Sequence, residues 1–363
     1  MRGDPMRRNL PLLTWLSAAA LLCLRGPGFA AEPITYAAGS DPQVFCDAVQ
    51  QALDREDFAT LSATVKAART LAARFPGGRT VLEGFYDTVA GSGCVGNSAY
   101  LQPFWRDEKA VDRRSDHLNH WREDGSDPIG SAIALAEFWD DFAWVSSGSS
   151  WMSKLPLMEN YLFNQRVETA SSYLKDMDPR VDAVAYLTLM NLARDQHQSR
   201  FKIDALFEEA RRQYPTVITY YRDYAEMLMP RWYGARGEVG EFARSLLRDP
   251  GGDDGAIFYS RVLERVAYDP EVDVLLAEIG PDWTVARDAF QIREKRYGLS
   301  SNAWGALCYL AAASGDRPTA REAFRHWVTH VNIYARGGGG DFFLRILPWI
   351  MARDGDKTPP PQL

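Results

Sequence analysis

The sequence contains few of the residues, and none of the motifs, that mark common catalytic and metal sites. It has only 5 His and 4 Cys among 363 residues, with no CxxC pair and no Cys/His cluster. Neither the GxSxG nor the HExxH motif occurs. The pairs His117/His120 and His326/His330 have no identifiable third ligand, and the four glycines at 337–340 lack the preceding strand of a phosphate loop. The sequence therefore predicts no catalytic residue, no metal site and no cofactor.

The chain also lacks an apolar run long enough to span a membrane. Its apolar run from Leu10 to Leu24 falls short of the ~20 residues that a spanning helix needs. Arg7 and Arg8 precede this run, and the helix-breaking RGPG follows it. This order is typical of a cleavable secretory signal, which we expect over residues 1–30 with cleavage before Ala31. We therefore expect a periplasmic or secreted protein with no stable membrane insertion after cleavage.

An excess of basic residues is absent as well. The chain carries 41 Lys and Arg against 48 Asp and Glu. Removal of residues 1–30, with their four Arg and one Asp, leaves 37 basic and 47 acidic residues, a net charge of about −10. Nucleic-acid binding needs a basic surface, so this balance argues against DNA and RNA as general partners. It places no restriction on protein, peptide or sugar partners.

No run of alternating apolar and polar residues predicts a β-strand. Apolar residues recur at helical spacing, and Asp-Pro pairs at 41–42 and 127–128 supply a helix cap and a first-turn proline. The sequence predicts an all-α fold of about twelve helices in antiparallel hairpins. We expect N-terminal hairpins over 41–91, a linker or elaborated loop over 92–126, a helical domain over 127–355 and a disordered tail over 356–363.

The best match to a known repeat is the segment Asn302–Trp327. Gly315-Asp316 occupies the turn of a tetratricopeptide hairpin, and the other motif positions hold Trp304, Leu307, Cys308, Ala311, Ala320, Phe324 and Trp327. Weaker copies begin at Phe45 and Leu187. The three copies predict a degenerate tetratricopeptide-like α/α superhelix, although any pair of amphipathic helices of this length matches some of these positions.

The densest aromatic and basic cluster lies between two predicted helices. Thr216 is expected to cap the first helix, Pro230 ends it, and Gly237 begins the second. Between the helices lie the candidate binding residues Arg231, Trp232, Tyr233 and Arg236. Arginine beside aromatic rings on a proline-fixed loop is typical of a binding platform. The alternative is that Trp232 packs between hairpins and Arg231 pairs with Glu238 or Glu241.

These segments also resemble a known bacterial family. FWDDFAW at 138–144, LFEEARRQYP at 206–215 and YYRDYAEMLMPRWYG at 220–234 precede the hairpin at 302–327. In this order they resemble the uncharacterised family called domain of unknown function 4034, with PRWYG as the most specific part. Tyr233 departs from the family pattern, because it separates the tryptophan from the glycine. The resemblance implies a helical repeat fold over most of residues 40–330 and no particular activity.

Three cysteines remain after removal of residues 1–30, namely Cys46, Cys94 and Cys308. Cys308 falls at a small-residue core position of the repeat, so the candidate disulfide is Cys46–Cys94. The alternative is that all three are reduced and pack as small apolar side chains.

Two functions from different classes fit these features. The first is an exported, non-catalytic helical-repeat protein that binds another protein or a peptide through its concave surface. The second is a secreted carbohydrate-active hydrolase with an (α/α) toroid, because Trp139 and Trp144 flank Asp140 and Asp141. Adjacent helical residues point in different directions, so a second carboxylate must come from elsewhere, and nothing in the sequence nominates it.

Overall fold

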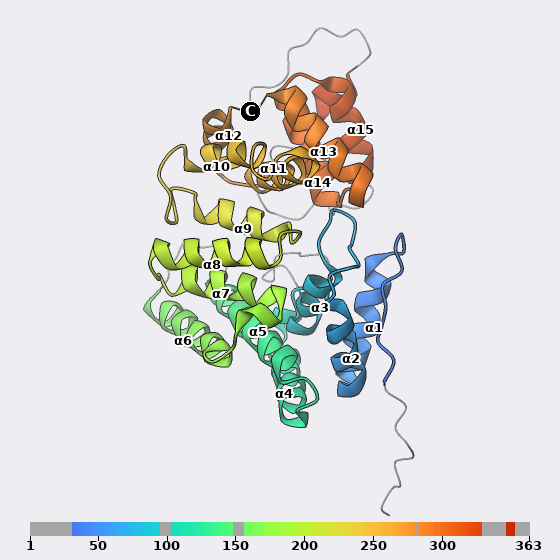
Figure 1. Ribbon diagram of the computed structural model, residues 1–363, viewed down its shortest axis with the longest axis vertical. Helices are drawn as coiled ribbons and strands as arrows, with labels where there is room; N and C mark the ends of the chain where they lie inside the picture. The colour runs from blue at the N-terminus through green and yellow to red at the C-terminus, as the bar shows by residue number, and fades with distance from the viewer. Residues whose placement is uncertain (1–30, 95–102, 148–155, 281, 329–345, 353–363) are drawn as a thin grey trace, which may run out of the picture. The chain divides into compact units, whose positions relative to one another are not determined.

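The computed structural model describes residues 31–94, 103–147, 156–280, 282–328 and 346–352 (Figure 1). Fifteen α-helices have both ends within these ranges. No strand occurs in the same ranges apart from an isolated bridge between Arg74 and Thr80. The prediction of an all-α fold is therefore confirmed.

The helices follow one another with short connections. Their bounds are α1 Pro42–Asp54, α2 Phe58–Ala68, α3 Val81–Ala90, α4 Glu108–Asp124, α5 Pro128–Ser147, α6 Leu157–Leu174, α7 Ala183–Asp195, α8 Arg200–Gln213, α9 Thr219–Met227, α10 Glu238–Leu246, α11 Gly252–Ala267, α12 Val272–Ile279, α13 Trp283–Tyr297, α14 Ser301–Ala313 and α15 Arg317–Val328. Short 3-10 turns lie at Pro103–Arg106 and Pro179–Val181.

Aspartate caps fix where helices α1 and α5 begin. The Asp41 carboxylate accepts a hydrogen bond from the Gln43 amide, and proline occupies the first turn of α1. Asp127 accepts a 2.7 Å hydrogen bond from the Gly130 amide at the start of α5. Both Asp-Pro helix starts that the sequence predicted are present.

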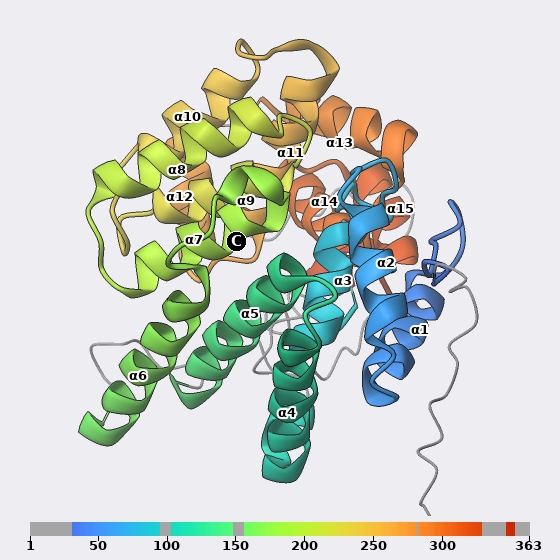
Figure 2. The same ribbon diagram turned by 60° about the horizontal axis from the view of Figure 1, so that its bottom comes forward.

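Neighbouring helices pack in pairs and also in an alternating series. The consecutive pairs include α5 with α6, α7 with α8, α9 with α10 and α14 with α15. In addition, each of the odd-numbered helices from α3 to α13 packs against the next odd-numbered one (Figures 1 and 2). This alternation is the arrangement expected of stacked helical hairpins.

Arg69, at the end of α2, joins the first hairpin to the starts of two later helices. Its guanidinium donates to Asp127 at 2.7 Å and to Asp182 at 2.8 Å. Asp182 caps α7, and its side chain has no exposed surface. The Tyr86 hydroxyl donates a further 2.8 Å hydrogen bond to the same carboxylate. One arginine therefore ties the two caps together.

Residues 69–80, here called the connecting segment, form hydrogen bonds with later parts of the chain. Arg74 donates a 2.9 Å hydrogen bond to the Thr216 hydroxyl before α9. The Gly77 amide donates to the Gly298 carbonyl at 3.1 Å, and Arg293 on α13 donates to the Gly77 carbonyl at 3.0 Å. The segment thus bonds to residues near α9, α13 and α14, beside which it lies in Figure 1.

Two expectations about local structure were wrong. Thr216 does not cap α9, which begins at Thr219 without a side-chain cap, because its hydroxyl is engaged by Arg74. Residues 103–106 and 108–124 are helical, whereas a linker or elaborated loop was expected over 92–126. Helix α4 is strongly polar, and only a narrow stripe that includes Leu118 and Trp121 is fully buried.

Several predictions fall on residues that the structure does not describe. They are the signal at 1–30, the tail at 356–363, the glycine run at 337–340 and His330. Within the described part of the chain, no helix combines the length and the apolar character needed to cross a membrane.

A disulfide joins α1 to the residues that follow α3. The sulfur atoms of Cys46 and Cys94 are 2.00 Å apart and their Cα atoms are 5.5 Å apart. Cys308 is a free and fully buried thiol on α14. Burial in the apolar core raises the pKa of this thiol to about 12, which suppresses its reactivity because the thiolate is the reactive form.

We predict that the chain from Ala31 onward shows no reactive thiol when folded and one when unfolded without reductant. Reduction before unfolding is expected to expose three. The measurement is a thiol-reagent titration with and without reductant and denaturant. Replacing Cys46 and Cys94 by serine is expected to lower the free energy of unfolding by about 2–5 kcal/mol. Three thiols in the unfolded, unreduced protein would show that the disulfide is absent.

Candidate functional site

Arg231, the first residue of the predicted binding loop, is held by a buried carboxylate. Its two terminal nitrogens contact the two oxygens of Asp269 at 2.8 and 2.5 Å. The Asp269 side chain has no exposed surface, and Arg265 also approaches it at 3.2 Å. The expected partner, Glu238, instead accepts hydrogen bonds from the Ala235 amide and from Arg200. Arg231 is therefore paired, but across 38 residues of sequence rather than within its own loop.

Trp232 and Tyr233 pack against the end of α7. The Trp232 ring lies edge-on to Trp144, with centroids 6.3 Å apart, and the Arg194 guanidinium lies 5.2 Å from its centroid. The Tyr233 hydroxyl donates to the Arg194 carbonyl at 3.1 Å. A Cβ atom on Gly234 would lie 1.7 Å from the Leu228 carbonyl oxygen, so only glycine fits there.

The loop thus separates into supporting and exposed residues. Arg231, Trp232 and Tyr233 are partly buried, whereas Arg236 is exposed. Trp139 and Trp304, the other two rings considered as ligand platforms, are also partly buried and pack against the core. The structure brings the first three candidates together but directs them toward neighbouring helices. Their main role is to fix the junction between α9 and α10.

Arg194, against which Trp232 packs, belongs to a wider network of charged groups. Its guanidinium lies 5.1 Å from the Trp144 ring centroid and donates to both oxygens of Asp195, at 2.7 and 3.1 Å. The Trp144 indole donates a further 2.8 Å hydrogen bond to that carboxylate. An arginine held between two tryptophan rings and a buried carboxylate has little freedom to move.

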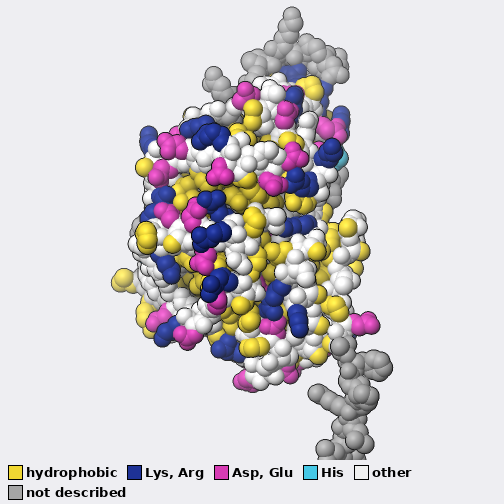
Figure 3. All heavy atoms as spheres, in the orientation of Figure 1, with side chains coloured by type: hydrophobic (Ala, Val, Ile, Leu, Met, Phe, Trp, Pro, Cys, Tyr) yellow, Lys and Arg dark blue, Asp and Glu magenta, His cyan; other side chains and the backbone are white. Residues whose placement is uncertain are grey.

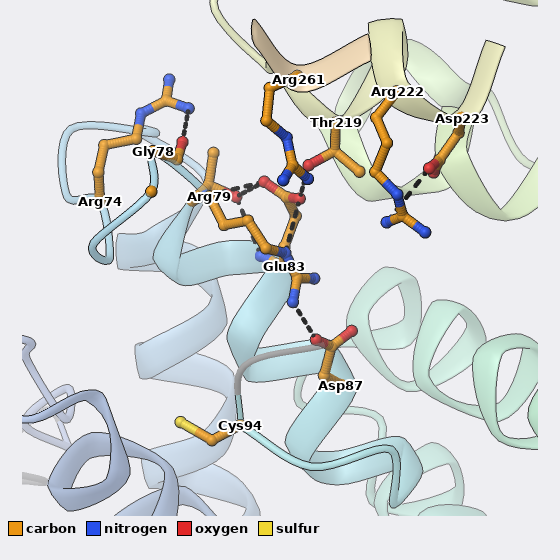
Figure 4. A network of polar contacts seen from close by, with 12 residues as sticks. Arg74, Gly78, Arg79, Glu83, Asp87, Cys94, Thr219, Arg222, Asp223 and Arg261 are labelled. Atoms are coloured by element: carbon orange, nitrogen blue, oxygen red, sulfur yellow. Dashed lines mark hydrogen bonds and ion pairs between the residues drawn. The ribbon is translucent and has the colours of Figure 1, made fainter. Parts of the chain in front are cut away.

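A group of recessed charged side chains, here called the polar recess, lies beside this network. Asp87 comes from α3, Arg79 lies two residues before that helix, and Arg222 and Asp223 come from α9 (Figure 4). The two other members, Glu137 and Asp141, come from α5. Arg79, Asp87 and Asp223 retain 15, 17 and 13% of their side-chain surface, and Arg222 retains 38%. The recess is therefore packed between helices yet in contact with solvent.

Arg79 forms ion pairs with two carboxylates of α3. It donates to Asp87 at 2.6 Å and to Glu83 at 3.3 Å (Figure 4). Glu83 also accepts from Thr80 at the start of α3 and from the Thr219 hydroxyl of α9. Burial alone would raise the pKa of Glu83, but Arg79 and these hydrogen bonds lower it below its ordinary value. This carboxylate is therefore ionised and joins α3 to α9.

The carboxyls of α5 have a different environment. Glu137 accepts a hydrogen bond from the Thr188 hydroxyl, and Asp141 accepts one from the Ser92 hydroxyl. Burial and the neighbouring Asp87 raise the pKa of Glu137 to about 7, against the effect of Thr188. Burial and the nearby Glu137 raise the pKa of Asp141 well above its ordinary range. Glu137 therefore titrates near neutral pH, and Asp141 holds its proton to a higher pH than an ordinary aspartate does.

Asp87, Glu137 and Asp223 are the residues that sequence reasoning missed. The charge of Asp87 and the charge of Asp223 both act on Glu137, so the three face one another from α3, α5 and α9. A charged residue on the apolar face of a predicted helix was the available signal. That signal does not reveal which distant helices meet.

The histidines form surface contacts rather than a metal cluster. His120 contacts Glu56 at 2.7 Å, with His117 at 3.9 Å from the same carboxylate oxygen. His326 stacks on Trp304, with ring centroids 4.2 Å apart. Among the residues that the structure describes, no group of three or more His, Cys, Asp or Glu side chains is placed to hold a metal ion.

A separate apolar groove of about 530 Å³ lies between α4, α5 and α6. Its lining includes Ile129, Tyr173 and Met177, and the Arg122 guanidinium lies 5.2 Å from the Tyr173 ring centroid. None of the residues of the polar recess lines it. On the face shown in Figure 3, basic and acidic side chains are interspersed with hydrophobic ones, without a basic patch.

Comparison with models of protein families, with curated proteins and with solved structures finds no match. The resemblance to domain of unknown function 4034 and the tetratricopeptide-like assignment therefore stay predictions.

We predict that Arg231→Ala lowers the free energy of unfolding by about 2–3 kcal/mol, since it leaves the buried Asp269 with the more distant Arg265 and the Glu271 amide as its partners. Arg236→Ala, the matched change at an exposed position of the same loop, is expected to change it by less than about 0.5 kcal/mol. Chemical denaturation of the two variants measures the difference. Equal stability of the two would show that Arg231 has no structural role.

Proposed function

We propose that this chain is an exported, non-catalytic helical-repeat protein that binds another protein or a peptide. The polar recess carries the proposal, because charged side chains from three helices meet there and remain in contact with solvent. Charged groups in a partly desolvated recess interact more strongly with a complementary partner than surface charges do. Stacked helical hairpins commonly bind partners on surfaces formed by successive units.

The aromatic and basic loop supports this surface indirectly. Trp232 packs on Arg194, and Arg194 acts electrostatically on Asp223 in the polar recess. Mutation of Trp232 is therefore expected to alter binding by moving the α7 end of the network, not by removing a contact to the partner. Arg236 is the exposed residue of the loop that a partner can reach directly.

We expect the signal at 1–30 to direct export, so the purified periplasmic or secreted protein should begin at Ala31. Affinity capture from such extracts should enrich at least one specific partner. Arg222→Glu reverses a charge in the recess and should reduce that enrichment at least tenfold. Quantitative mass spectrometry of the captured proteins measures both results.

Arg325→Glu is the matched control for this experiment. Arg325 is 69% exposed on α15, where it pairs with Glu322, and its reversal should leave capture unchanged. Failure of the wild-type protein to enrich any partner over the charge-reversed variant would contradict the proposal. Retention of residues 1–30 in the mature protein would contradict export by a cleaved signal.

One observation favours a second candidate function, a secreted carbohydrate-active hydrolase. The sequence nominated no second carboxylate for Asp140 and Asp141, whereas Glu137 faces Asp87 and Asp223 from other helices. A carboxyl that titrates near neutrality beside an ionised one is the pairing that general acid–base catalysis uses. This function requires hydrolysis of at least one polysaccharide in a substrate panel, with loss of at least a hundredfold in rate on Glu137→Gln.

A further inference from the structure

Three neighbouring carboxyls of α5 have no cationic partner. Glu137 stands one turn before Asp140 and Asp141, at i, i+3 and i+4, so it shares a side of the helix with each of them, while the two adjacent aspartates point in different directions. Among the residues that the structure describes, no Lys, Arg or His forms an ion pair with any of them. We call these three residues the α5 carboxyl face.

The carboxylates around this face are paired. Asp87 bonds to Arg79 at 2.6 Å, and Asp195 bonds to Arg194 at 2.7 Å. On α9, Glu226 bonds to Arg265 at 2.8 Å. The absence of such a partner on α5 is therefore a local property and not the general state of recessed carboxyls in this protein.

Asp140 gives a second indication, because one of its buried oxygen atoms lacks a hydrogen-bond donor. It is 7% exposed, yet its Oδ1 atom has no hydrogen-bond partner in the described part of the chain. Its charge interacts with Asp195, Arg194, Glu137 and Asp141, which places it among them. A buried polar side chain without a partner is rare in folded proteins and calls for an explanation.

None of the charged groups around the α5 carboxyl face forms an ion pair with it in the described part of the chain. Those that act on it are Arg79 and Asp87 from the α3 side, Arg194 and Asp195 from α7, and Asp223, paired with Arg222, from α9. On α6, Arg166 donates to the Phe142 carbonyl, one turn further along α5. Each of these arginines already contacts an oxygen other than those of the face.

We propose that the α5 carboxyl face binds a cationic nitrogen group, an ammonium or a guanidinium. Such a group carries several N–H donors and a positive charge, and it matches oxygens spread over one helical turn. No three His, Cys, Asp or Glu side chains among the described residues are placed to hold a metal ion, whereas one or two carboxylates are enough to bind a guanidinium or ammonium. If the proposed protein-binding function holds, and this choice of ligand rests on it, the group is a Lys or Arg side chain of a partner peptide. A small free amine offers the same chemistry.

Binding is coupled to proton release. Burial and neighbouring negative charge raise the pKa values of Glu137, Asp140 and Asp141, so these carboxyls carry protons at pH values where ordinary ones are ionised. A bound cation stabilises the ionised forms and expels those protons. Affinity should therefore increase as pH rises from 5 to 8, and fall as the carboxyls become protonated at lower pH.

The test uses the chain from Ala31 onward and isothermal titration calorimetry at pH 5, 6.5 and 8. The probes are an acetylated, amidated tri-lysine peptide, the same peptide with acetylated lysine side chains, and butylammonium. We expect tri-lysine to bind at least tenfold more tightly at pH 8 than at pH 5, with proton release seen as buffer-dependent enthalpy. Butylammonium binding of similar strength would identify a small amine as the ligand source, whereas binding of the peptide alone would identify a basic side chain.

The variants locate the site. Glu137→Gln with Asp141→Asn keeps the size of the side chains and should weaken tri-lysine binding at least tenfold. Asp47→Asn is the matched control, because Asp47 is an exposed helical carboxylate that accepts a hydrogen bond from the neutral side chain of Gln43. It should leave binding unchanged. If the double variant does not fold, tri-lysine binding is measured with Asp141→Asn alone, and proton release is measured with the wild-type protein.

Several outcomes would overturn the inference. These are equal binding of the acetylated peptide, affinity independent of pH, equal weakening by Asp47→Asn, or no binding of any cationic probe. The inference and the proposed function fail separately. Capture of a partner without binding of the cationic probes rejects the cation site alone, whereas binding of the probes without any captured partner rejects the protein-binding function alone.

Discussion

The structure depends on ion pairs to carboxylates that begin helices but lie away from water. Arg69 pairs with both Asp127 and Asp182, which cap α5 and α7. Each carboxylate satisfies an amide of its helix and would be costly to bury as an unpaired charge. One arginine therefore sets the positions of two helices in the odd-numbered series. The α5 carboxyl face and the end of α7 take their positions from this contact.

The same arrangement recurs at other junctions. Arg231 binds Asp269, and Arg293, which has no exposed surface, binds Glu264 at 2.6 Å. Because the guanidinium offers several donors in a plane, one side chain can satisfy a carboxylate and a backbone carbonyl together. Arg293 does so with Glu264 and Gly77. Junctions built in this way exclude alternative pairings more strictly than apolar contacts do, because a buried carboxylate needs its cation.

The sequence was sufficient where the determining contacts are local. The Asp-Pro helix starts and the hairpin around Gly315-Asp316 are present because caps and turns depend on neighbouring residues. Helix α4 was missed because its few apolar residues do not form a clear stripe. The partner of Arg231 was missed for another reason, since Glu238 and Asp269 are chemically equivalent and only tertiary structure selects between them.

The candidate site shows the same limit. The sequence placed Asp140 and Asp141 on one helix but gave no way to find the groups that face them. Their surroundings come from α3, α7 and α9, which are separated from α5 by tens of residues. An unpaired carboxyl can be recognised only when every neighbouring cation has been assigned to another partner. That assignment requires the complete set of side-chain contacts.

The connecting segment has a consequence for how the chain folds. Stacked repeats contact only their neighbours, so they can gain or lose terminal units one at a time. Here Arg293 reaches the Gly77 carbonyl across 216 residues of sequence, and the chain must bring its two halves together before this contact forms. Such long-range closure slows folding. It also makes the ends of the series depend on each other, so a shortened chain loses stability throughout, not only at the cut.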